Sequence, residues 1–196
     1  MSDIKAGEAA GSGDDLYPNP AILIGGTGTI GLISALSLPW PVAAASTLLG
    51  TLMIAGAEVD ARTFLLPNLV TWGAIICGIL AAPLLNTTEP WTAVGEAIER
   101  AGCVAGMLAL FRAGYAWRRQ TEGLGLGDVK LGAAIGAWLP LEAIPWCFGL
   151  ATSGALLAVM LARLSGEPVM RTTKIPFGAF LCPALWIAFY ADSLTR

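Results

Sequence analysis

The sequence predicts an all-α fold, a polytopic transmembrane helical bundle of about six to seven spans. Of the 196 residues, 56% are hydrophobic and 13% are charged, and the mean hydropathy is +0.70. Soluble domains carry about 25% charged residues, so most of this chain has no water to face and its solvent must be lipid. Apolar segments bounded by Pro, Gly or charged residues recur along the chain, and a single compact bundle suits this length.

Seven apolar segments mark the expected helices. A membrane span takes about 17–25 residues, and the fifth segment is shorter because Pro140 and Pro145 crowd its end. Abundant Gly and Ala would let helices approach closely in lipid. The segments are 20–38, 42–58, 69–85, 97–116, 129–141, 144–162 and 177–193.

The first 19 residues differ from the rest of the chain. They hold four acidic residues against one Lys, which accounts for the whole net charge of −3. A short acidic stretch rich in Gly is typical of disorder. We therefore expect a disordered acidic cytoplasmic tail at 1–19 and one transmembrane domain at 20–196.

The composition excludes several kinds of site. The chain has no His, which removes His-ligated zinc, His-based triads and imidazole proton relays. Its four cysteines stand singly in apolar segments, so we expect no metal site and no disulfide framework. The sequence contains no cluster of basic residues that could bind the phosphates of a nucleic acid, so no nucleic-acid partner is expected. Acid–base chemistry must use carboxylates, Lys, Tyr or Cys, and no cofactor is implied.

Lys and Arg predict the orientation in the membrane. The loops after the second, fourth and sixth segments and their flanks carry seven of them, whereas the opposite side carries only Arg196. Such an excess marks cytoplasmic loops. Asp60 ends the second segment and Asp128 begins the fifth, so we expect both aspartates at the cytoplasmic face.

Carboxylates at a membrane edge are costly and mark functional sites. Two neighbouring aspartates do not both ionise easily, so one keeps a proton near neutral pH. The ionised one can deprotonate water while the protonated one polarises a carbonyl, which is a route to peptide hydrolysis without metal. Asp60 and Asp128 are candidates for such a pair, and Glu58 competes with Asp60 for the first position.

Structural roles for the same residues stay open at this point. Asp60 could pair with Arg62 at the level of the lipid headgroups. Asp128 could be the N-cap of a helix that follows a flexible turn. Gly125 and Gly127 could instead let a substrate backbone come close to the carboxylate, because they have no side chain.

Three segments resemble the type IV prepilin peptidases. The stretch DARTFLLPN at 60–68 is similar to the one that carries the family's first catalytic aspartate. The stretch EGLGLGDVKL at 122–131, followed by GAW at 136–138, is similar to the family's GxGD motif and the helix after it. The stretch KIPFGAF at 174–180 resembles the IPFGPF-type segment that opens the last helix, with Ala179 where Pro is usual. A lone GxGD would be weak evidence, but three motifs in order over about 56–190 are strong.

The resemblance implies that Asp60 and Asp128 are the catalytic pair, and it decides against Glu58. It implies an aspartic endopeptidase of the bacterial inner membrane that removes the short basic leader of pilin-like precursors at the cytoplasmic face. The implied partners are a prepilin or pseudopilin substrate and membrane lipid. Full-length members also carry two C-x-x-C pairs that bind zinc and methylate the product, features that this sequence does not show, so a short form without methylation is expected.

Further motif residues are candidates for shaping the site. Lys130 could bias the aspartate pair electrostatically or only anchor the chain at the headgroups. The Pro-Asn pair at 67–68 could end one helix and cap the next, and the Pro-Phe-Gly segment at 176–178 could line a substrate groove or simply pack. The candidates are Pro67, Asn68, Gly125, Gly127, Lys130, Pro176, Phe177 and Gly178.

Two other functional classes compete with a peptidase. An ion-coupled transporter would usually place carboxylates near the middle of the membrane and show paired broken helices. A non-catalytic membrane protein of pilus assembly would need neither aspartate. In this sequence the acids stand at segment ends, and no internal repeat is visible.

Overall fold

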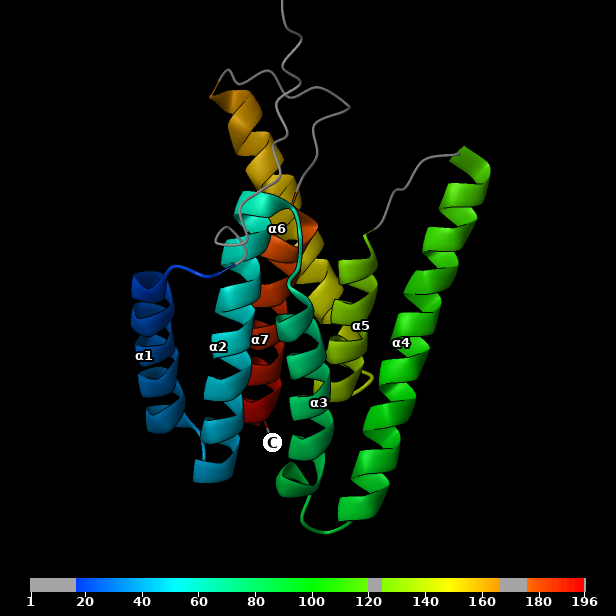
Figure 1. Cartoon of the computed structure of the whole chain (residues 1–196). Coiled ribbons are helices and arrows are strands. Elements are labelled where there is room, and N and C mark those ends of the chain that lie inside the picture. The colour runs from blue at the N-terminus through cyan, green and yellow to red at the C-terminus, as the bar shows by residue number, and fades with distance from the viewer. Residues whose placement is uncertain (1–16, 120–124, 166–175, 196) are drawn as a thin grey trace, which may run out of the picture.

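The part of the chain that the structure describes forms seven α-helices, and the predicted all-α class is confirmed (Figure 1). The computed structural model describes residues 17–119, 125–165 and 176–195, and this part of the chain contains no strand. Each predicted apolar segment corresponds to one helix. The helices are α1 (Pro20–Ser37), α2 (Trp40–Thr63), α3 (Asn68–Leu85), α4 (Pro90–Arg119), α5 (Leu126–Trp138), α6 (Ile144–Leu164) and α7 (Phe177–Thr195).

Five of the helices, α1, α2, α3, α6 and α7, are long and apolar enough to cross a membrane. The other two differ for separate reasons. Helix α5 has only 13 residues, fewer than the roughly 17 that a span requires. Helix α4 is the longest at 30 residues but carries several Glu and Arg side chains. The chain is therefore a polytopic helical bundle in which α4 and α5 are the least typical membrane segments.

Several helix boundaries differ from the prediction, and α2 ends at Thr63 rather than at 58. Helix α4 begins at Pro90 rather than near 97. Pro suits the first turn of a helix, because the backbone N–H that Pro lacks would have no partner within the helix there. Helix α5 lies three residues earlier than expected, with Gly125 as its N-cap. It ends at Trp138 because Leu139 is extended, the conformation favoured before a proline.

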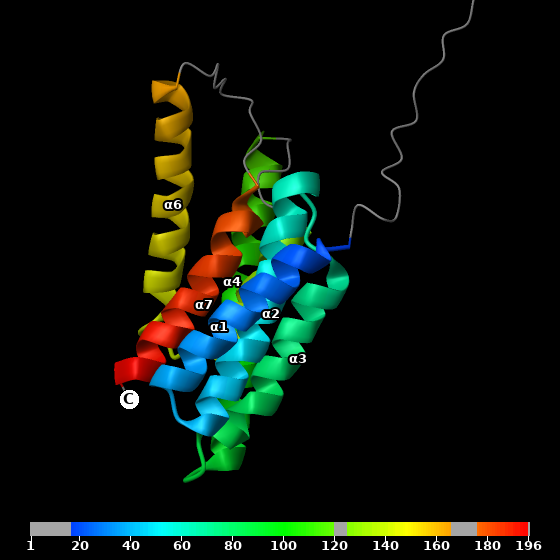
Figure 2. The same ribbon diagram turned by 90° about the vertical axis from the view of Figure 1, so that its left-hand side faces the viewer.

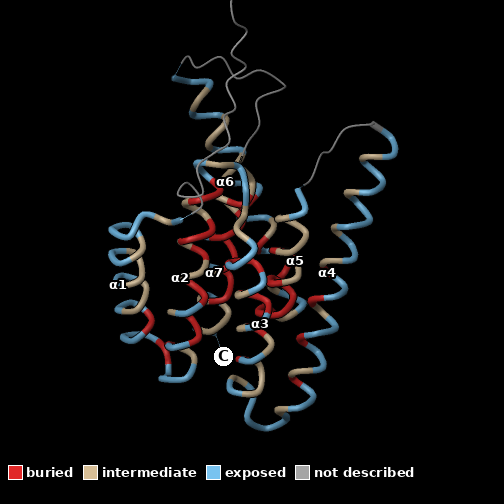
Figure 3. The backbone as a smooth tube through the Cα atoms, in the orientation of Figure 1, coloured by how far each residue is buried: buried red, intermediate tan, exposed pale blue. Residues whose placement is uncertain are grey.

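Helices α2, α3, α5 and α7 form the buried centre of the bundle (Figure 3). Helix α1 packs on α2, α4 packs on α3 and α5, and α6 packs on α7. The buried residues of α6 are confined to its first half, and its second half diverges from α7 (Figure 2). The centre of the bundle therefore fixes the relative positions of the helices that carry Asp60 and Asp128.

Trp138 joins three of the central helices. Its Nε1 donates a 2.7 Å hydrogen bond to the Ala74 carbonyl of α3. Its ring meets Phe189 of α7 edge to face, with centroids 5.3 Å apart. A buried Trp is favourable where its N–H finds such a partner, so the end of α5 is fixed against both α3 and α7.

Successive helices run in alternating directions (Figure 1). The C-terminal ends of α2, α4 and α6 lie at the same end of the bundle as the N-terminal ends of α3, α5 and α7. Asp60 is in the last turn of α2 and Asp128 is in the first turn of α5. The prediction that the two aspartates share one end of the bundle is therefore confirmed.

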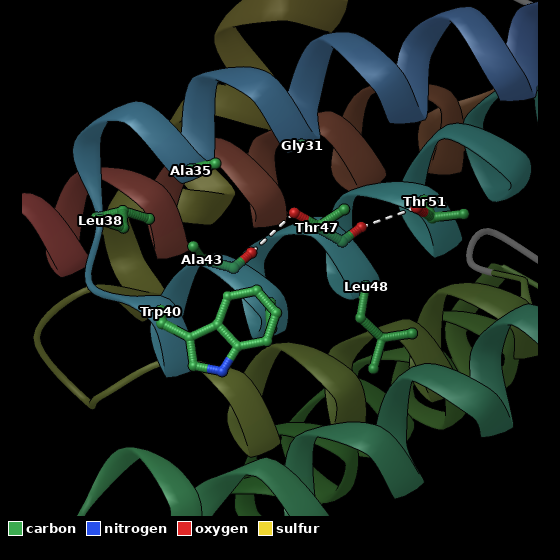
Figure 4. A pocket seen from close by; sticks show the side chains of 9 residues that line it. Gly31, Ala35, Leu38, Trp40, Ala43, Thr47, Leu48 and Thr51 are labelled. Atoms are coloured by element: carbon green, nitrogen blue, oxygen red, sulfur yellow. Dashed lines mark hydrogen bonds between the residues drawn. The ribbon is translucent and has the colours of Figure 1, made fainter.

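A pocket of about 580 Å³ lies between α1 and α2, near the opposite end from the aspartates (Figure 4). Two of its threonines, Thr47 and Thr51, donate their hydroxyls back to helix carbonyls. They therefore have no hydroxyl proton left to offer a ligand. None of the nine lining residues is ionisable, so we assign no chemistry to this pocket.

We predict that Gly136→Ala destabilises the bundle. A β-carbon at this position would collide with the backbone carbonyl of Arg100 in α4, so α4 and α5 would have to separate. Overpacking of this kind costs about 1–3 kcal/mol. Thermal unfolding in detergent micelles measures the loss. Gly102→Ala is the matched control, because nothing lies within 4 Å of its β-carbon position, and equal melting temperatures for the two variants would contradict the prediction.

Candidate active site

Two carboxylates lie at one end of the bundle. Asp60 is 5% exposed in the last turn of α2, and Asp128 is half-buried in the first turn of α5. The charge of Asp60 acts on Asp128, and the Cys182 thiol of α7 interacts electrostatically with both. The structure thus brings together the two residues that the sequence singled out.

The N-terminus of α7 holds the Asp60 carboxylate. The Ala179 N–H donates a 2.8 Å hydrogen bond to Asp60 Oδ2, and Ala179 is the third residue of that helix. The first amides of a helix have no partner within it and favour an anion. A β-carbon on Gly178 would lie 2.8 Å from the same oxygen, so this approach of the carboxylate requires glycine.

The role of Ala179 is not evident from the sequence, where it is only a change from the Pro that is usual at this position. A proline has no N–H and could not donate to Asp60 as Ala179 does. The departure from the family's usual residue therefore gives this chain a hydrogen bond to one of its two central carboxylates. In the sequence this departure directly follows Gly178, but nothing there points to Asp60 as its partner.

Asp128 is the third residue of α5, and Gly125 is the N-cap, so the alternative that made Asp128 the N-cap is wrong. The Gly125 backbone amide donates to the Asp128 carboxylate, just as the N-cap amide donates to an acidic side chain at this position in a capping box. Burial, with the nearby Asp60 charge, raises the pKa of Asp128 to about 6, although the Gly125 hydrogen bond acts in the opposite direction. Asp128 therefore holds its proton to a higher pH than an ordinary aspartate.

Glu58 has a different set of partners from Asp60. It forms a 3.0 Å ion pair with Arg62 and accepts a hydrogen bond from the Asn19 amide. Arg62 also donates to the Tyr17 carbonyl. Glu58 and Arg62 thus fasten the segment before α1 to α2, and the alternative that paired Asp60 with Arg62 is wrong.

Lys130 and Asn68 contact each other. Lys130 Nζ donates a 2.6 Å hydrogen bond to Asn68 Oδ1 and lies 5.9 Å from the Trp72 ring centroid. These contacts link α5 to α3. Pro67, not Asn68, is the N-cap of α3, so the expected capping role of Asn68 is wrong.

Gly127 and Gly178 face one side chain that the sequence analysis did not single out, Leu66 in the connection between α2 and α3. Phe177 is partly buried and packs against the core, and Pro176 directly precedes it. Substrate-binding roles for these residues remain predictions.

Comparison with known proteins identifies the family. The type IV leader peptidase family matches residues 47–166, which is more than half of the chain and includes both aspartates. The chain belongs to the type IV leader peptidase family. No solved structure matches this leader peptidase chain significantly.

Curated relatives of this leader peptidase family member include both long and short proteins. The chain is 33% identical over 190 residues to a prepilin leader peptidase/N-methyltransferase of Aeromonas salmonicida. The matched part is 92% of this chain and 60% of that relative. The chain is 34% identical over 160 residues to the protein of the same name from Aeromonas hydrophila, covering 78% and 51%. It is 34% identical over 141 residues to leader peptidase HopD of Salmonella typhimurium, covering 68% and 86%. The chain thus spans about half to three fifths of the two Aeromonas proteins.

We predict that Asp128→Asn stabilises the folded protein at pH 7. Folding raises the pKa of this carboxyl from the usual 3.8 to about 6. The contribution of the protonated Asp128 to the free energy of unfolding is therefore fully present below pH 3.8 and is lost as the pH rises through 6. A neutral amide avoids that loss, roughly 1–3 kcal/mol, and can still accept from Gly125. The melting temperatures of the wild type and of Asp128→Asn, measured from pH 4 to pH 7, should diverge as the pH rises. Two curves that stay parallel would contradict the prediction.

Proposed function

We propose that this chain is an aspartic endopeptidase in which Asp60 and Asp128 together activate water for cleavage of a peptide bond. One observation carries the proposal: Asp60 and Asp128 come from separate helices to one end of the bundle, where burial and, next to it, the Asp60 charge raise the pKa of Asp128. A shared proton between two acids is the arrangement that lets one act as base and the other as acid.

The proposal gives the two acids different roles, because the Asp60 charge adds to burial in raising the pKa of Asp128. Asp60 accepts from the Ala179 amide at the start of α7, and such a donor stabilises the ionised carboxylate. In the proposed mechanism Asp60 is the base that takes a proton from water. Asp128, with its pKa raised to about 6, keeps the shared proton and donates it toward the scissile carbonyl oxygen.

The substrate and the membrane side belong to the same proposal. The aspartate end of the bundle carries Arg62, Arg118, Lys130 and Arg163, and Lys and Arg accumulate on the cytoplasmic side of membrane proteins. We place the site at the cytoplasmic face of the bacterial inner membrane. The names of the two Aeromonas relatives support a prepilin as substrate. We extend the proposal to pseudopilin precursors, with the cut between the basic leader and the hydrophobic helix.

The two competing classes make different demands on the aspartates. An ion-coupled transporter would need its carboxylates on a path through the membrane, whereas Asp60 and Asp128 both lie near helix ends. A non-catalytic assembly protein would tolerate their replacement. Loss of cleavage on replacement of either acid therefore separates the peptidase from both alternatives.

We predict that Asp60→Asn and Asp128→Asn each abolish cleavage. Loss of an acid–base group costs roughly 10²–10⁴-fold in rate. Each variant should be co-expressed with a pilin precursor that has a basic leader and a Gly–Phe junction, and the products separated by gel. Insertion of each variant in the membrane fraction is verified in parallel.

Glu58→Gln is the matched control. Glu58 is an acid on the same helix, two residues from Asp60, but its carboxylate pairs with Arg62 and accepts from the Asn19 amide. We expect Glu58→Gln to cleave at close to the wild-type rate. Wild-type cleavage by either Asp→Asn variant would remove that aspartate from the mechanism. Equal loss in Glu58→Gln would show that the assay reports disruption of α2 rather than chemistry.

A further inference from the structure

The side chain of Leu66 lies where helices of the active site meet. A β-carbon built on Gly127 of α5 would lie 3.0 Å from Leu66 Cβ and 3.3 Å from its Cδ1. A β-carbon built on Gly178 of α7 would lie 2.8 Å from the same Cδ1. Leu66 therefore packs on the backbone directly before Asp128 and directly before Ala179, whose amide holds Asp60.

The third contact of Leu66 is with α2 itself. A β-carbon on Gly56 would lie 3.5 Å from Leu66 Cδ2, and Gly56 is one helical turn before Asp60. One glycine on each of α2, α5 and α7 thus lies beside Leu66. Because none of them has a side chain, the three backbones come close to one leucine, which fills the space between them.

The spacing between α2 and α5, which carry the two acids, is set by other helices that pack against both. Within the described residues, α2 and α5 have no extensive interface of their own, whereas α3 and α7 each pack against both. Near the carboxylates the connection between α2 and α3 contributes Leu66 to this arrangement. The distance between Asp60 and Asp128 must therefore respond to the size of the side chain at position 66.

We propose that Leu66 is a positioning residue of the peptidase, the spacer between Gly127 and Gly178 that sets the separation of Asp128 and Asp60. The proposal rests on the proposed function, in which the two acids act as a pair. A smaller side chain would leave a gap that α5 and α7 close incompletely and that admits water beside the acids. Misplacement of catalytic groups by about 1 Å can cost 10²-fold in rate.

The test is a series of side chains at position 66. Leu66→Val keeps the β-carbon beside Gly127 but loses both δ-carbons, and Leu66→Ala loses the γ-carbon as well. Leu66→Met restores the reach toward Gly178 and is the conservative rescue. Leu65→Ala is the matched control, because Leu65 is in the same connection but is 61% exposed.

Cleavage of a purified pilin precursor by purified enzyme in detergent gives kcat and KM separately. We expect kcat to fall at least about tenfold in Leu66→Ala and by less in Leu66→Val, with KM within about twofold of wild type, because the acids and not the substrate contacts are displaced. Leu66→Met and Leu65→Ala should keep wild-type kcat within about twofold.

The pH profile separates positioning from a loss of folded enzyme. The groups that face Asp128 are Asp60 from α2, Cys182 from α7 and the Gly125 amide. Water admitted beside Asp128 favours its ionised form, so the alkaline limb of kcat should move to lower pH in Leu66→Ala. Partial unfolding would lower the amount of active enzyme and leave the limb in place.

Each outcome bears on the proposal. Wild-type kcat and an unmoved alkaline limb in Leu66→Val and Leu66→Ala overturn it, while the proposed peptidase function stands. If Leu66→Ala does not fold, Leu66→Val is compared with Leu66→Met. A kcat that is reduced in Leu66→Val but not in Leu66→Met supports the positioning role of Leu66, and an equal kcat in the two variants overturns it. A wild-type protein that cleaves no precursor overturns the proposed function and this inference together.

Discussion

Two carboxylates at one end of an apolar bundle are the constraint on which the rest of the structure depends. A buried charge is costly unless hydrogen bonds or a proton compensate it. Asp60 receives the Ala179 amide. Asp128 receives the Gly125 amide, and its raised pKa keeps it protonated to a higher pH than usual. A backbone amide thus offsets part of the cost of burial at each of the two acids.

The glycines around the site follow from this constraint. Gly178 allows the start of α7 to reach the Asp60 carboxylate, and Gly127 allows Leu66 to pack beside Asp128. Farther from the site, Gly136 lets α4 cross α5 at the Arg100 backbone. In lipid, helices associate through close packing rather than through exclusion of water. Small residues at these crossings therefore fix the geometry that a larger apolar core would fix in a soluble protein.

Much of the fold could be predicted from the sequence, because lipid imposes long apolar helices and Lys and Arg mark their loops. The placement of Asp60 and Asp128 at one end followed from these rules. The roles of Ala179, Leu66 and Glu58 did not, because each depends on a contact between segments distant in sequence. Ala179 meets Asp60 across 119 positions, and no local pattern encodes that hydrogen bond.

The most direct test of the central claim is a titration of the two carboxyl groups in the wild-type protein. Asp60 and Asp128 can be followed by ¹³C NMR of labelled aspartate in nanodiscs, with single Asp→Asn variants for assignment. We expect Asp128 to titrate near pH 6 and to move to lower pH when Asp60 is replaced by Asn. Independent titrations near pH 4, unchanged by that replacement, would contradict a proton shared by the pair.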